Sequence, residues 1–62
     1  MDFKKNILEL MEKNNLTYKD MYEKLNVTKQ AFNSMINAKN PRIETLKTLK
    51  EIFNCTYEDL LK

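Results

Sequence analysis

The sequence contains no glycine, no histidine and no tryptophan, and it has one proline and one cysteine. With one thiol and no imidazole, the chain lacks the side chains that build a protein zinc site or a Cys–His nucleophile. The lone Cys55 has no partner for an internal disulfide, which fits a reducing compartment. No cofactor or metal is therefore expected, and an enzyme is the least favoured class of protein.

A long apolar run is also missing. No segment is long enough to span a bilayer, and the N-terminus lacks the apolar core of a signal peptide, so a cytoplasmic protein is expected. The 62 residues predict one domain over 1–62. A domain of this size buries only about 60% of the surface that its unfolded chain exposes. We therefore expect a stability of roughly 3–9 kcal/mol.

Positive charge is concentrated in the middle of the chain. Residues 24–50 carry six Lys or Arg side chains against one Glu, a net charge of +5, whereas the whole chain has a net charge of +2. A basic centre between mildly acidic ends indicates one positive face, as expected for a protein that meets a phosphate backbone. An ordinary solvated surface accounts for this clustering equally well.

Apolar spacing and capping residues predict five short helices. Their expected bounds are Phe3 to Asn14, Tyr18 to Leu25, Lys29 to Ile36, Pro41 to Phe53, and Tyr57 to Leu61. The expected caps are Asp2, Thr17 with Asp20, Thr28, Asn40 followed by Pro41, and Thr56 with Asp59. The expected apolar positions of these helices include Phe3, Ile7, Leu10, Met11, Met21, Leu25, Phe32, Met35, Ile36, Ile43, Leu46, Leu49 and Phe53, with Cys55 as a buried thiol.

The second and third predicted helices are joined by Asn26, Val27 and Thr28. Three residues leave room only for a tight corner. Asn26 can take the left-handed conformation that ends a helix, at less cost than most residues other than glycine. Val27 is then expected to pack between the two helices. A short helix, a tight corner and a second helix with a polar outer face make the helix-turn-helix pattern.

The order and spacing of all five segments resemble the phage-repressor family of helix-turn-helix domains, the lambda repressor and Cro type, also called the Xre family. The resemblance is carried by LTYKDMYEKLNVTKQAFNSMINAKNP, Leu16 to Pro41, and by IETLKTLKEIFNCTYEDLL, Ile43 to Leu61. It implies an all-α fold: a compact five-helix lambda-repressor-like domain with the helix-turn-helix at its second and third helices.

Several positions depart from the family's usual residues. Asn15, Asn26 and Asn54 stand where such sequences usually have glycine, and asparagine is the next-best residue for a left-handed cap. Ala38 also replaces a common glycine, so we expect Asn37 to take up that turn. Tyr22 replaces a small alanine between the motif helices, and its ring must slide to the edge of the contact or separate the helices.

One departure is paired. Family members often bury an Arg in the first helix against a Glu at the end of the third, and here these positions resemble Met11 and Ile36. Removing one partner of a buried ion pair costs about 3–5 kcal/mol, whereas replacing both with apolar residues is often neutral. The alternative is that Met11 and Ile36 are ordinary core residues and that their pairing is a coincidence.

The resemblance implies that the third helix reads bases in the major groove. Its outward side chains are short or forked hydrogen-bonding groups without an acid, which suits base edges. The residues expected to contact bases are Thr28, Lys29, Gln30, Asn33 and Ser34. The bland alternative is a solvated helix face.

Phosphate contacts are expected on both sides of this helix. The start of the second helix can bind phosphate through its N–H groups, although the Tyr18 ring could equally cover the core. The loop after the third helix lies along the phosphates in the family, whereas Lys47 and Lys50 are expected to be solvated. The residues expected at phosphates are Thr17, Tyr18, Asn37, Lys39, Asn40 and Arg42.

The function that these expectations favour is a Cro-like regulator that represses by occupying a short, palindromic double-stranded DNA operator as a dimer. The expected interface of a weak homodimer, strengthened by DNA, is Ile52, Tyr57 and Leu61. The alternative is a protein-interaction module on the same scaffold, antitoxin-like or antirepressor-like. No membrane partner or small-molecule ligand is expected. The abundance of Lys, Asn and Ile fits an AT-rich genome, such as that of a phage or mobile element.

Overall fold

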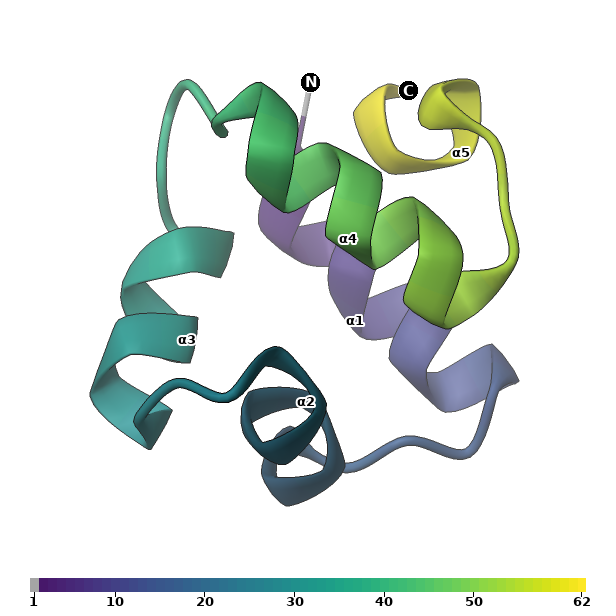
Figure 1. The fold of residues 1–62 in the computed structure, drawn as a ribbon. Coiled ribbons are helices and arrows are strands. Elements are labelled where there is room, and N and C mark those ends of the chain that lie inside the picture. The colour runs from purple at the N-terminus through teal and green to yellow at the C-terminus, as the bar shows by residue number, and fades with distance from the viewer. Residues whose placement is uncertain (1) are drawn as a thin grey trace.

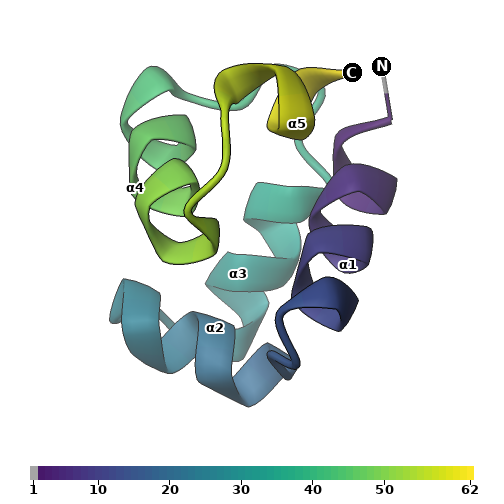
Figure 2. The same ribbon diagram turned by 90° about the vertical axis from the view of Figure 1, so that its right-hand side faces the viewer.

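A computed structural model describes residues 2–62 and is all-helical (Figure 1). The helices are α1 (Phe3–Lys13), α2 (Tyr18–Leu25), α3 (Lys29–Ile36), α4 (Ile43–Phe53) and α5 (Tyr57–Leu61). α1 packs against α5 and α3, α2 packs against α3, and α4 packs against α5. α2 lies at the end of the molecule opposite α5 (Figures 1 and 2). The predicted bounds of α2, α3 and α5 are confirmed, and α1 ends one residue earlier than expected.

One apolar core is shared by all five helices. Its buried members are Phe3, Ile7, Met11, Met21, Phe32, Ile36, Leu46, Leu49, Phe53 and Leu60. Burying a side chain of this size is worth about 1.5–3 kcal/mol. Met11 and Ile36 are both in this core, 4% and 1% exposed. Both residues that stand in place of the family's Arg and Glu are therefore buried, as expected.

The caps explain why the helices begin where they do. Asp2, Thr17, Thr28 and Thr56 each accept a hydrogen bond from a backbone N–H of the helix that follows. Thr17 and Thr56 also form full capping boxes with Asp20 and Asp59. A polar side chain at the N-cap satisfies N–H groups that the helix itself leaves without a partner. These caps were predicted from the sequence and are confirmed.

The start of α4 was predicted wrongly. Its N-cap is Arg42, without a side-chain hydrogen bond, so Asn40 does not cap the helix and Pro41 lies before its first turn. Ile43 was expected in the core but is 79% exposed. The buried stripe of α4 begins three residues later, at Leu46, and continues through Leu49 and Phe53.

Three helix–helix corners share one tripeptide plan. Asn15, Asn26 and Asn54 are the described residues with a positive φ, at 56°, 57° and 51°. Each is followed by a half-buried apolar residue and then by the threonine that caps the next helix. The apolar residue's N–H bonds back five residues in each corner, as in Val27 N to Tyr22 O at 3.0 Å. This is the Schellman arrangement, so asparagine replaces the usual glycine without changing the backbone.

The end of α3 is built differently. Asn37 terminates the helix with right-handed dihedrals, φ −94° and ψ 0°. It therefore ends the helix as expected, but without the left-handed conformation used at the other corners. Cys55 was expected to be buried, but it is only half-buried at the edge of the core.

Candidate nucleic-acid interface

α3 presents one polar face to solvent. Phe32 and Ile36 lie one turn apart and are buried, which turns the remaining face outward. The exposed side chains on that face are Lys29, Gln30, Asn33 and Ser34. The face holds one cation and three neutral hydrogen-bonding groups, and no carboxylate. The predicted base-contacting residues therefore share one accessible surface.

Thr28 opens α3 with a hydroxyl that has two tasks. Its Oγ1 accepts a 3.1 Å hydrogen bond from the Ala31 N–H. A hydroxyl that accepts in this way still has its own hydrogen to donate. Thr28 can therefore cap the helix and contact an acceptor outside the protein at the same time.

The N-terminus of α2 already holds a negative group. Asp20 accepts a 2.9 Å bond from the Thr17 N–H, and Thr17 Oγ1 accepts a 3.1 Å bond from the Asp20 N–H. The bond from the Thr17 N–H is the main cause that lowers the pKa of Asp20 below its usual value, so this carboxylate is ionised at neutral pH. The negative charge of Asp20 repels a phosphate at the N-terminus of α2, and the Thr17 N–H already donates to that carboxylate. A phosphate contact at this end of α2 would therefore use side chains or the N–H groups of the first turn.

Tyr18 joins this end of α2 to the core. Its ring meets the Phe32 ring edge to face, with centroids 5.3 Å apart and planes at 86°. Such a pair is worth about 0.5–1.5 kcal/mol beyond burial. The ring therefore covers the core, as one of the two interpretations expected, and it links α2 directly to α3.

The loop from α3 to α4 places two of its polar residues beside Ser34 of the α3 face, whereas Lys39 lines a hollow with Asp2 and Lys4. Asn37, Lys39, Asn40 and Arg42 are all exposed. Ser34, Asn40 and Arg42 also line one hollow of about 430 Å³, whose apolar floor includes Val27 and Met35. A residue predicted to read bases and two predicted to meet phosphates thus share one rim.

The predicted dimer residues lie at the other end of the molecule. Tyr57 and Leu61 are 42% and 36% exposed, and Ile52 is half-buried against the core. Lys50 is exposed, as expected, and its Nζ lies 4.9 Å from the centroid of the Tyr57 ring. This contact fixes a cation beside the apolar patch that Tyr57 and Leu61 form.

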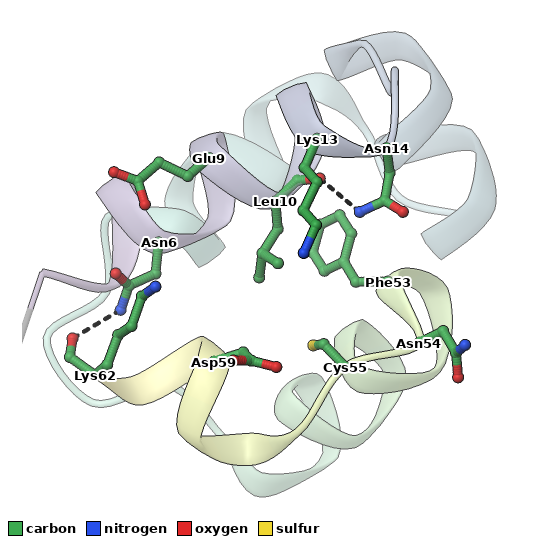
Figure 3. Close-up of a pocket in the computed structure, with 10 residues that line it drawn as sticks. All are labelled: Asn6, Glu9, Leu10, Lys13, Asn14, Phe53, Asn54, Cys55, Asp59 and Lys62. Atoms are coloured by element: carbon green, nitrogen blue, oxygen red, sulfur yellow. Dashed lines mark hydrogen bonds between the residues drawn. The ribbon is translucent and has the colours of Figure 1, made fainter.

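A second hollow separates α1 from the C-terminal segment (Figure 3). It has a volume of about 400 Å³ and a mixed lining that includes Lys13, Cys55 and Asp59. Burial raises the pKa of the Cys55 thiol, so it is protonated at neutral pH and a poor nucleophile. Within residues 2–62 no cluster of three or more His, Cys, Asp or Glu side chains could hold a metal ion.

The buried polar side chain among residues 2–62, that of Asn6, was not predicted from the sequence. Asn6 is 5% exposed and donates from Nδ2 to the carbonyl oxygens of Leu60 and Lys62, both at 2.9 Å. It ties α1 to the end of α5 (Figure 3 shows the bond to Lys62). Its helical position beside Ile7 was the available signal, but its partners lie at the other end of the chain.

Comparison with known proteins gives the class of this domain. A family model described as the Cro/C1-type HTH DNA-binding domain matches residues 6–62. The chain therefore belongs to the Cro/C1-type family of helix-turn-helix DNA-binding domains, with α2 and α3 as its helix-turn-helix. No curated protein and no solved structure matches it. No helix among residues 2–62 has the length and hydropathy to cross a membrane.

Proposed function

We propose that this chain is a single 62-residue domain that binds double-stranded DNA sequence-specifically as a small Cro-like transcriptional regulator. In this proposal residues 28–36 enter the major groove, and the regulator represses by occupying its operator. The observation that carries the proposal is the exposed, acid-free face of α3 in a chain of the Cro/C1-type family. Amide, hydroxyl and ammonium groups are the donors and acceptors that distinguish base edges in that groove.

The loop after α3 supports the same geometry. Arg42 is exposed and lines the same hollow as Ser34 of the α3 face. Lys39 is exposed in the same loop, so both cations can neutralise phosphates while the α3 face meets the bases. Phosphate contacts fix the register of a protein on the duplex, and base contacts select the sequence. The two groups of side chains therefore divide the work that sequence-specific binding requires.

We further propose that two copies bind one palindromic operator. Two-fold helix-turn-helix dimers place their recognition helices about 34 Å apart, which is one turn of DNA. Tyr57, Leu61 and the neighbouring Ile52 supply an apolar patch on the domain itself. Dimerisation doubles the number of bases read, because one short helix contacts only a few base pairs.

The competing function is a protein-interaction module on the same fold. One observation favours it: Ile43 is 79% exposed, directly after Arg42, which lines the hollow. An exposed isoleucine can contact a protein partner. This observation concerns one side chain, whereas the polar face and the loop involve eight or more groups.

Salt titration on selected duplexes tests the proposal. Duplexes would be selected from a random pool with the whole chain, and binding measured by fluorescence anisotropy across a range of salt concentrations. We expect the selected duplex to bind about a thousandfold or more tightly than a scrambled one, with affinity falling as salt rises. Lys13→Ala is the control for the loss of a positive charge away from the proposed interface, because Lys13 lines the hollow of Figure 3 and not the α3 face. This variant should keep the preference for the selected duplex. Equal affinity for every duplex, or no detectable binding to any duplex, would favour the interaction module.

A further inference from the structure

The asparagine that ends α3 contacts a predicted base-reading residue. Asn37 Nδ2 lies 2.7 Å from the backbone oxygen of Asn33 and 3.3 Å from the side-chain oxygen of the same residue. Both side chains are exposed. The contact joins the loop after α3 to the face that would enter the groove.

The chemistry of the two acceptors fixes the orientation of both amides. A backbone carbonyl oxygen can only accept, so the Asn37 atom that meets it must be the nitrogen. The same nitrogen has a second hydrogen, so the Asn33 atom that meets it must be the oxygen. The Asn37 NH₂ group therefore donates to both oxygens of Asn33, and the Asn37 Oδ1 is an acceptor that a phosphate oxygen would repel.

A matched residue in α1 shows what is particular to α3. Asn14 ends α1 with φ −100° and ψ 7°, and its Nδ2 donates to the backbone oxygen of Leu10 at 2.7 Å (Figure 3). The backbone dihedrals and the bond to the residue four positions earlier are the same as at Asn37. Leu10 has no amide, so at Asn14 the second hydrogen meets no side chain of that residue. The side-chain bond at Asn37 thus exceeds what ending a helix requires.

We infer that Asn37 is a positioning residue for base readout. It holds the Asn33 oxygen toward the end of α3, so that Asn33 presents its NH₂ group to the base edge. This inference rests on the proposed function of α3. It replaces the expected phosphate contact of Asn37 with an action through Asn33.

A fixed NH₂ group selects bases that offer an acceptor. Guanine, adenine and thymine each present an acceptor in the major groove, whereas cytosine presents only its N4 donor. If the Asn33 amide could rotate by half a turn, its oxygen would accept a hydrogen bond from the N4 group of cytosine. Asn37 therefore excludes cytosine at the base that Asn33 reads, by preventing that rotation.

The test uses the duplex selected by the wild-type chain and its single base-pair substitutions. Asn33→Ala first locates the base pair whose preference depends on Asn33. At that pair, Asn37→Ala should reduce discrimination against cytosine by about two- to tenfold, the fold-change that one net hydrogen bond is worth. The salt dependence should not change, because no charge is removed. Asn14→Ala loses the same helix-end bond and should leave base preference intact.

Each other result would overturn the inference. If Asn37→Ala weakens binding to all duplexes equally, the residue contacts phosphate or only supports the helix. If it still relaxes base preference when Asn33 is already alanine, it does not act through Asn33. If Asn33→Ala itself changes no preference, the proposed function of α3 has failed. If Asn33→Ala relaxes the preference but Asn37→Ala has no effect, only the positioning role of Asn37 has failed.

Discussion

The side-chain amide of Asn6 in α1 donates a 2.9 Å hydrogen bond to the carbonyl oxygen of Leu60, 54 positions later in the chain. A second 2.9 Å bond from the same nitrogen reaches the Lys62 oxygen. These carbonyls belong to the last turn of α5 and the residue after it, where a helix has no partner of its own for its oxygens. Asn6 supplies that partner from a different helix.

Replacing Asn6 should therefore release α5. We expect Asn6→Ala to lower the free energy of unfolding by about 1–3 kcal/mol, because carbonyl groups at a part-buried site lose their donor. Urea titration followed by circular dichroism measures this. Asn14→Ala removes an exposed bond of similar length and should cost clearly less. Equal midpoints for wild type and Asn6→Ala would show that α5 does not depend on this amide.

The buried Met11 and Ile36 give a second prediction. Ile36→Glu places a charge at a position that is 1% exposed, and should destabilise by about 3–5 kcal/mol. Adding Met11→Arg should recover a large part of the loss, since it supplies the opposite charge. Thermal unfolding of the two single variants and the double variant checks the coupling. Losses that simply add would mean that the two side chains do not form a pair.

Variants of base-contacting and phosphate-contacting residues should differ in how they change the salt dependence of DNA binding. Gln30→Ala should cost about 1–3 kcal/mol on the selected duplex and relax the preference at one base pair, with an unchanged salt slope. Lys39→Ala or Arg42→Ala should weaken binding to every duplex and lower the slope by about one unit, through one fewer released counterion. If Gln30→Ala and Asn33→Ala change neither affinity nor preference, α3 does not read DNA.

The apolar patch on α5 should control assembly. We expect Leu61→Glu to weaken self-association on a palindromic duplex, because it places a charge in an apolar contact, while Leu8→Glu on α1 should not. Both leucines are 36% exposed, so the pair is matched for burial. Sedimentation velocity with and without DNA gives the stoichiometry. Wild-type chain that remains monomeric on the palindrome would refute the proposed dimer.

The capping boxes should make the domain sensitive to acid. Hydrogen bonds from the N–H groups of Thr17 and Thr56 are the main causes that lower the pKa values of Asp20 and Asp59. A folded-state pKa below the unfolded value stabilises the fold above the unfolded pKa, and this stability is lost as pH falls through the folded value. The double variant Asp20→Asn, Asp59→Asn should therefore show a flatter stability profile below about pH 4. Urea unfolding at several acidic pH values measures the profile, and an unchanged slope would assign the acid sensitivity to other groups.

The helices that could be predicted correctly are those with local signals. Thr17, Thr28 and Thr56 cap helices whose bounds follow from a few neighbouring residues, so their positions were readable from the sequence. Arg42 begins α4 without a side-chain hydrogen bond, and Asn40 before the only proline gave a false signal. The exposure of Ile43 could not be foreseen because periodicity shows which face a residue shares but not where the core ends.

The candidate interface was predictable to a similar degree. The outward face of α3 follows from Phe32 and Ile36 being one turn apart, and family resemblance pointed to the same residues. The contact between Asn33 and Asn37 needs coordinates, since the sequence shows their spacing but not which amide hydrogens are used. Asn6 escaped prediction because nothing near it in sequence indicates partners 54 positions away.

The three corners built on Asn15, Asn26 and Asn54 also bear on how the domain meets its ligand. Each is held by backbone bonds and a half-buried side chain, and none contains a glycine. The corner between α2 and α3 is therefore a fixed joint, whose ordering cost is met when the chain folds and not when DNA arrives. Preorganised binding of this kind changes little in shape on association, so differences in affinity among variants should lie mainly in dissociation rates.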